Sequence, residues 1–281
     1  MLKDYYYLTK PGIVYSNTAN AIVGYIYGSN WHIHFAKLIY LILGAGLIVA
    51  SSCVANNVLD VKIDSKMERT KTRAIITKKI NKSEALIYSL VLGLLGILFL
   101  SFTSKLVLGI CVFASLIYIF IYGYVKRISK FGTLVGTLPG SATLIAGYSL
   151  ASGKLNVVTL LLFLIMLAWQ MSHFYSIAIF RIEDYSKAKV PIWPIISGVR
   201  NTKLQIRFFI TLFIVAILGL SIFKYNGIIF GLLMSLAGLY WLRESFKVNK
   251  NDQKWARHLF FLSLMELLFF MIMLPIGKLL P

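Results

Sequence analysis

Long apolar runs constrain this chain more than any other feature of its sequence. Polar segments separate nine of them, at residues 12–29, 36–57, 84–103, 106–125, 132–151, 156–180, 206–224, 227–242 and 259–277. A membrane-spanning α-helix needs about 20 mostly apolar residues, whereas a strand of a membrane β-barrel has about ten alternating ones. The runs therefore predict an all-α, polytopic membrane protein, a single domain over residues 1–281 with nine transmembrane helices in a bundle.

The position of the positive charge predicts the orientation of these helices. The net charge is +19, and 24 of the 29 Lys and Arg residues lie on one side, in the N-terminus and the loops within 58–83, 126–131, 181–207 and 243–257. Such a bias marks the cytoplasmic side of a membrane protein. We therefore expect a multi-pass protein of the cell (inner) membrane with a cytoplasmic N-terminus and an external C-terminus. The same distribution argues against a nucleic-acid partner.

A polar stretch that directly follows the second apolar run carries the clearest chemical pattern. Asn56, Asp60 and Asp64 are four residues apart, a spacing that places all three side chains on one face of a helix. Neighbouring carboxylates repel one another unless a cation lies between them. Mg²⁺ commonly binds one or two carboxylates and completes its shell with water and substrate phosphate. The pattern predicts a Mg²⁺ site formed by these three residues.

Basic residues follow in the same stretch. Arg69 and Arg73 are again four apart, and guanidinium groups bind phosphate oxygens in pairs. With Asp60 and Asp64 they predict a diphosphate site at the membrane surface. A solvated, charge-mixed loop is the alternative interpretation, although acidic residues beside a buried helix are costly and are usually functional.

Two other helix ends carry candidate residues. Tyr122 and Lys126 share a face at the end of the fourth run, where they form either a second phosphate clamp or an interfacial Tyr beside a Lys that extends to the membrane surface. Gln170 and His173 lie about two turns inside the end of the sixth run. His173 is either a ligand or a hydrogen-bonded core residue, and spacing alone leaves both open.

With these residues in view, the sequence resembles the UbiA superfamily of intramembrane prenyltransferases over nearly its whole length. The first matching motif is Asn56-x-x-x-Asp60-x-x-x-Asp64-x-x-Met67-x-Arg69-Thr70-x-x-Arg73. The second is Arg181-x-x-Asp184-Tyr185-x-x-Ala188-x-x-Pro191-x-x-Pro194. The Asp60 to Arg73 pattern and the Trp169-Gln170 pair with His173 resemble the haem-directed branch of the superfamily rather than its quinone-directed members.

The resemblance implies a helix bundle around a central cavity that is open to the cytoplasmic side. It also implies Mg²⁺-dependent transfer of a farnesyl group from farnesyl diphosphate to the 2-vinyl group of haem B, which gives haem O for terminal oxidases. The implied catalytic residues are Asp60, Asp64, Arg69, Arg73 and Lys126. The implied substrate-binding residues are Asn56, Asn57, Tyr122, Gln170, His173, Arg181, Asp184 and Tyr185.

Two other functions remain open from the sequence. A prenyltransferase that acts on a quinone precursor, such as hydroxybenzoate or naphthoate, would share the Mg²⁺ site. A cation-coupled transporter would also use acidic residues, but near the bilayer midplane, and here the Asp pair lies at the rim. The expected partners are farnesyl diphosphate, haem B, the lipid bilayer, and haem-processing or oxidase-assembly proteins.

Overall fold

The computed structural model describes residues 2–247 and 249–281, and every regular element in them is helical. The elements are α1 (Leu2–Leu8), α2 (Pro11–Ser29), α3 (Phe35–Leu59), α4 (Val61–Asp64), α5 (Lys82–Ser101), α6 (Lys105–Leu116), η1 (Ile117–Tyr122), α7 (Gly123–Ile128), α8 (Gly132–Ser152), α9 (Val157–Phe180), α10 (Ile182–Lys187), α11 (Trp193–Ser197), α12 (Val199–Ile222), α13 (Ile228–Phe246) and α14 (Asp252–Ile276).

Eight of these helical segments are long and apolar enough to cross a membrane. They are α3, α5, the continuous rod of α6, η1 and α7, and then α8, α9, α12, α13 and α14. The protein is thus an integral, multi-pass membrane protein. The 19-residue helix α2 packs in the same bundle and contains Asn17 and Asn20, but it is not among these eight apolar segments. The count of nine spans therefore stays a prediction.

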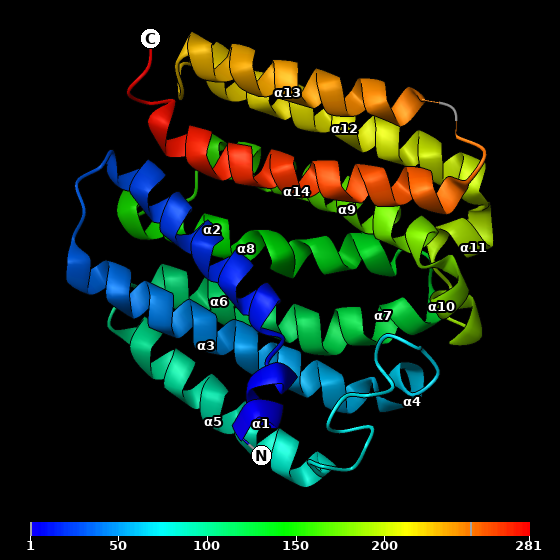
Figure 1. Cartoon of the computed structure of the whole chain (residues 1–281). Coiled ribbons are helices and arrows are strands. Elements are labelled where there is room, and N and C mark those ends of the chain that lie inside the picture. Colours follow the sequence, from blue (N-terminus) through cyan, green and yellow to red (C-terminus); the bar gives the residue numbers. More distant parts are fainter. Residues whose placement is uncertain (1, 248) are drawn as a thin grey trace.

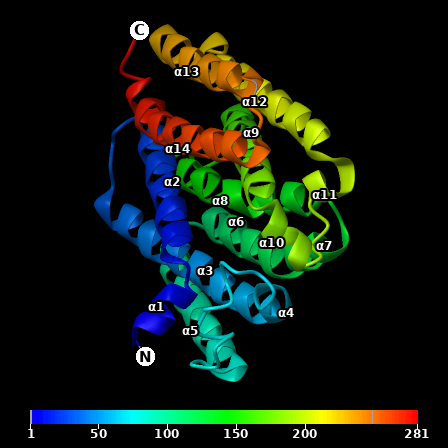
Figure 2. The same ribbon diagram turned by 45° about the vertical axis from the view of Figure 1, so that its right-hand side comes forward.

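Successive long helices run in opposite directions, so the connecting segments gather at two ends of the bundle. The end that carries α4, α7, α10 and α11 lies on the right in Figures 1 and 2, and the α2–α3 loop and the C-terminus lie on the left. Both motif segments therefore emerge at the same end, as the alternation of the apolar runs predicts.

Local sequence signals determine where several of these helices begin. Asn81 and Glu84 form a reciprocal capping box at the start of α5, and Asn156 forms one with Thr159 at the start of α9. Asn251 accepts a hydrogen bond from the backbone N–H of Lys254 at the start of α14. Such caps satisfy backbone donors that the first turn of a helix leaves free.

Glycines let α2 and α8 approach each other closely. A Cβ atom on Gly24 would lie 2.1 Å from the carbonyl oxygen of Leu144, and one on Gly147 would lie 2.0 Å from that of Ala21. Only hydrogen atoms fit at these two positions, so the two backbones meet directly. Close packing through small residues is a common way to join helices inside a membrane.

The rod of α6, η1 and α7 is not a regular α-helix throughout. Residues 117–122 form η1, a short π-helical segment, and α7 follows without a break. Such segments often occur at functional sites. Here the segment ends at Tyr122, four residues before Lys126.

Candidate active site

A cavity of about 590 Å³ opens among the helices at the end that carries both motif segments. Its volume lies in the usual range of ligand sites, about 300–1,000 Å³. Residues from α2, α3, the α6–α7 rod, α8, α9 and α14 line it, together with the 60–73 segment and residues 185–192. One part of the lining is charged, and the part beside α9 and α14 is mainly apolar and aromatic.

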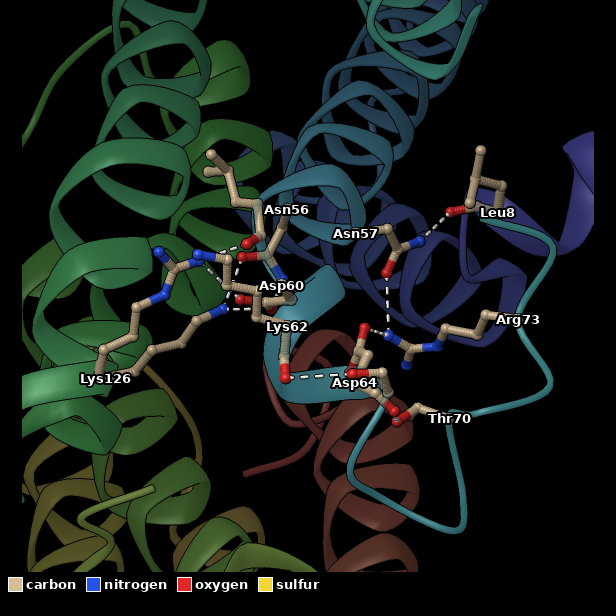
Figure 3. Close-up of polar contacts among 12 residues, drawn as sticks. Leu8, Asn56, Asn57, Asp60, Lys62, Asp64, Thr70, Arg73 and Lys126 are labelled. Atoms are coloured by element: carbon tan, nitrogen blue, oxygen red, sulfur yellow. Dashed lines mark hydrogen bonds and ion pairs between the residues drawn. The ribbon is translucent and has the colours of Figure 1, made fainter. Parts of the chain in front are cut away.

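Asp60 lies at the centre of one polar cluster in the charged part. Its carboxylate accepts hydrogen bonds from Asn56 Nδ2 at 2.8 Å, Lys126 Nζ at 2.5 Å and Arg127 Nη2 at 3.2 Å. Lys126 Nζ also donates to Asn56 Oδ1 at 2.7 Å (Figure 3). The Lys126 ammonium thus points toward Asp60 rather than toward the membrane surface. The Lys126 ammonium also lies over the aromatic ring of Tyr122, with Nζ 4.8 Å from the ring centroid.

Asp64 lies at the centre of a second cluster. Arg73 donates from Nη1 to Asp64 Oδ2 and also to Asn57 Oδ1, the latter at 3.0 Å (Figure 3). Asn57 in turn donates to the carbonyl oxygen of Leu8 at 2.8 Å, and Thr70 Oγ1 donates to the carbonyl oxygen of Asp64 at 2.7 Å. This network holds the 64–73 segment against α1 and α3.

The donor set fits one hard cation shared with a phosphate ligand. Asp60 and Asp64 are both buried, and both line the cavity together with Asn56. Within residues 2–247 and 249–281, no group of three His, Cys, Asp or Glu side chains could hold a metal ion. Two carboxylates and an amide match the incomplete protein shell that Mg²⁺ accepts when phosphate oxygens supply further ligands.

Positive charge exceeds negative charge in the described lining. The carboxylates in this lining are those of Asp60 and Asp64. Five cationic side chains line the same cavity, namely Lys10, Arg69, Arg73, Lys126 and Lys130. A surplus of this kind suits a ligand that carries several negative charges, such as a diphosphate.

Lys10 is a site residue that the sequence analysis did not identify. It lines the cavity and has no hydrogen-bond or ion-pair partner for its side chain in the described part of the chain. Burial lowers the pKa of its ammonium group. Its backbone is left-handed, with φ of 55°, just before Pro11. A cation immediately before the first apolar run is the signal that could have identified it.

The aromatic part of the cavity centres on His173 of α9. Trp169 stacks on the imidazole with ring centroids 4.9 Å apart and an interplanar angle of 19°. His173 Nδ1 lies 2.7 Å from Ser263 Oγ of α14, and the ring of Phe260 lies 5.0 Å away. Gln170 also lines the cavity, but its Nε2 donates to the carbonyl oxygens of Thr137 and Met166 and to Ser141 Oγ, which ties α9 to α8.

The structure places the other predicted residues in two groups. Tyr185 lines the cavity, and burial raises the pKa of its phenol. Asn57, Arg181 and Asp184 do not line it. Asn57 braces Arg73 from behind, and Arg181 lies over the ring of Phe180, 4.5 Å from its centroid. The second motif contributes Tyr185, Val190, Pro191 and Ile192 to the lining, and all four contacts are more apolar than the motif's charges suggest.

The two motif segments also touch each other through an apolar cluster. Met67 of the first segment packs with Ala188, Val190 and Ile192 of the second and with Ala178 of α9. The cluster joins the two halves of the chain at the mouth of the cavity.

Sequence comparison identifies the relatives of this chain. Residues 18–265 match the model of the UbiA prenyltransferase family. A protein of Yersinia pseudotuberculosis serotype O:1b (strain IP 31758), named protoheme IX farnesyltransferase, is 38% identical over 281 residues, which cover 99% of this chain and 95% of the relative.

Solved structures show the same fold at lower identity. A structure described for digeranylgeranylglyceryl phosphate synthase covers 99% of this chain and 98% of its own, with a TM-score of 0.81 at 21% identity. The structure of a UbiA homologue from Archaeoglobus fulgidus, bound to GPP and Mg²⁺, covers 96% of this chain and 99% of its own. Its TM-score is 0.75 at 14% identity. The fold and the full-length sequence match agree, and the chain belongs to the UbiA prenyltransferase family.

Proposed function

We propose that this prenyltransferase moves a farnesyl group from farnesyl diphosphate to the 2-vinyl group of haem B and so makes haem O. The observation that carries the proposal is a single cavity that joins a cationic, carboxylate-bearing part to an aromatic part containing His173. The name of the Yersinia relative, at 38% identity over nearly the whole chain, supports the same pair of substrates.

The charged part of the cavity would bind the diphosphate. Asp60, Asp64 and the amide oxygen of Asn56 would hold Mg²⁺, which when bound supplies positive charge to the diphosphate oxygens. Arg69, Arg73 and Lys126 line this part and would donate hydrogen bonds to the same oxygens. They would stabilise the negative charge that develops as the allylic C–O bond breaks.

The aromatic part would receive the porphyrin. In the reaction the vinyl group forms a bond to C1 of the farnesyl group, and water then adds to the resulting cation and releases a proton. Trp169, Met166 and Leu267 line this part of the cavity and would keep bulk water away from the allylic cation. His173 lines the same part, and imidazole is a common ligand of haem iron.

The orientation of the protein is part of the proposal. With the positively charged end in the cytoplasm, the cavity mouth would open to the cytoplasmic side of the inner membrane. Farnesyl diphosphate would then enter from the cytoplasmic side, with its chain among the helices. Haem O would pass to haem-processing or oxidase-assembly proteins.

The test is product formation by membranes that contain the overproduced chain. They are incubated with haem B, Mg²⁺ and isotopically labelled farnesyl diphosphate, and extracted haems are separated and identified by mass. We expect labelled haem O, and none in membranes without the chain. Transfer of the label to hydroxybenzoate or naphthoate, with haem B unchanged, would show that the acceptor is a quinone precursor and would overturn the proposal.

A further inference from the structure

The hydrogen bonds around His173 determine which of its ring nitrogens carries the proton. Ser263 Oγ donates its only hydrogen to the carbonyl oxygen of Phe260 at 2.6 Å. The same Oγ lies 2.7 Å from His173 Nδ1. Because the hydroxyl hydrogen is already used, Oγ can only accept from the imidazole. Nδ1 is therefore the protonated nitrogen.

The other ring nitrogen then faces the cavity. A neutral imidazole with its proton on Nδ1 carries a lone pair on Nε2. Nε2 has no hydrogen-bond partner among the described residues, and His173 lines the cavity. Nε2 is thus left to bind a ligand.

Neighbouring side chains also fix the position of the ring. Trp169 stacks on it and donates from Nε1 to the carbonyl oxygen of Ser263 at 2.6 Å. The same serine thus binds the imidazole through its hydroxyl and the stacking tryptophan through its backbone. Both bonds are buried and connect α9 to α14.

We propose that Ser263 is a positioning residue that holds His173 in the tautomer whose Nε2 ligates the haem iron during the reaction. The proposal rests on haem B being the acceptor and adds how its iron is held. A hydrogen bond from the second nitrogen of a ligating histidine fixes the tautomer and the ring orientation and raises the basicity of the ligand. Ser263, three positions from Glu266 on α14, supplies the acceptor for that bond.

Two porphyrins separate iron ligation from the shape of the cavity. The affinity of the purified, full-length protein in detergent is measured for haemin and for metal-free protoporphyrin IX, which has the same outline but no iron. His173→Ala and Ser263→Ala should each weaken haemin binding about tenfold or more, the usual range for such changes in metal sites. Both should leave protoporphyrin IX binding nearly unchanged.

Ser176→Ala is the matched control. Like Ser263, Ser176 is fully buried, and it lies on α9, one turn from His173. Its hydroxyl, however, donates to the carbonyl oxygen of Ser172 and not to the imidazole. It should change neither affinity. An equal loss for both porphyrins in Ser263→Ala would show a packing role only and would overturn the proposal.

Nitrogen NMR tests the tautomer directly. The chain has four histidines, so His173→Ala assigns the His173 signals after ¹⁵N-histidine labelling. We expect a protonated Nδ1 and an unprotonated Nε2, and a shift toward the other tautomer in Ser263→Ala. A protonated Nε2 in the unchanged protein would refute the assignment.

The outcomes also separate this inference from the proposed function. Haemin bound equally well with and without His173, in a chain that still makes haem O, would remove iron ligation and leave the function in place. Failure to bind either porphyrin would instead refute the function itself.

Discussion

Both carboxylates of the candidate active site form ion pairs, one with a residue distant in sequence and one within the same segment. Asp60 pairs with Lys126 of α7, and Asp64 pairs with Arg73. Removing one member of a buried ion pair leaves the other charge unpaired and typically costs about 3–5 kcal/mol. Substitutions here are therefore informative only when stability is measured beside activity.

We expect Asp60→Asn or Asp64→Asn to lower haem O formation about 100-fold or more, because an amide cannot supply the negative charge that Mg²⁺ requires. Labelled haem O is measured in membranes that contain equal amounts of each variant, together with the unfolding temperature in detergent. Glu68→Gln is the control, since Glu68 is exposed and forms its ion pair with Lys71, which is exposed as well. Near-normal product from either Asp variant would rule out the proposed site.

The buried ammonium group of Lys10 leads us to expect that kcat/KM for farnesyl diphosphate depends on pH. Burial lowers the pKa of Lys10, so in the free protein its ammonium loses its proton at a lower pH than an exposed lysine would. As the pH rises through that pKa, a positive charge is lost near Asp60, Asp64 and Arg73, and diphosphate binding should weaken. On the alkaline side of its pH profile, kcat/KM for farnesyl diphosphate should therefore decline at a lower pH than the usual pKa range of lysine.

Lys10→Arg checks this assignment, because a guanidinium stays charged throughout that range. The alkaline limb should move to higher pH in this variant, while Lys10→Met should raise KM for farnesyl diphosphate about tenfold at neutral pH. An unchanged limb in Lys10→Arg would show that another group controls it.

Sequence reasoning found the residues that form a local pattern and missed those that depend on distant contacts. Asn56, Asp60 and Asp64 share a helix face, and the structure places all three on the cavity. Asn57 comes one residue later, about 100° around the helix, and so turns toward Leu8 and Arg73. Ser263 becomes important only because α14 packs beside α9, which no local pattern reveals.

At the scale of elements, α8 carries glycines at intervals of four residues that make room for side chains of the candidate site. A Cβ atom on Gly136 would lie 2.9 Å from the Tyr122 ring, and one on Gly140 would lie 1.9 Å from Gln170 Oε1. One on Gly132 would lie 2.5 Å from the backbone of Lys126. Three candidate site residues thus pack directly against the backbone of α8.

We expect Gly147→Ala to lower the unfolding temperature, because the new Cβ would meet the carbonyl oxygen of Ala21 at 2.0 Å and force α2 away from α8. Gly109→Ala is the matched control, since a Cβ there meets nothing within 4 Å. It should be neutral or stabilise the helix by up to about 1 kcal/mol. Thermal unfolding in detergent compares the two, and equal effects would contradict the close approach of α2 and α8.

The apolar runs predicted the helices well but not their polar ends. The run at 259–277 marks the membrane part of α14, yet that helix begins at Asp252, and α12 begins at Val199 rather than 206. Both extensions contain charged residues such as Arg257 and Lys203, which a search for apolar residues excludes. Helix formation continues there because the cap at Asn251 and packing contacts support it.

At the scale of the whole molecule, the parts of the candidate site gather at one end of the bundle. Both motif segments, the cavity mouth and most basic residues lie there, while the C-terminus lies at the opposite end (Figure 1). The apolar cluster around Met67 holds the two motif segments together at that end.

This arrangement predicts the topology in the membrane. A reporter fused after Pro281 should be active on the outer side, and one inserted near Lys78 should be active in the cytoplasm, because positively charged loops are retained inside. Paired reporters that are active in opposite compartments measure both positions. Finding both positions on one side would contradict a chain that crosses the membrane an odd number of times.

The π-helical segment at residues 117–122 changes the direction in which the side chains after it point. A π-turn accommodates one residue more than an α-turn, so everything after it is rotated by about 100° relative to an uninterrupted α-helix. Lys126 and Arg127, which both contact Asp60, lie after that rotation. A substitution that made this segment a regular α-helix, with no residue removed, would leave the span long enough for the bilayer and every charged residue present, yet it would turn Lys126 away from Asp60.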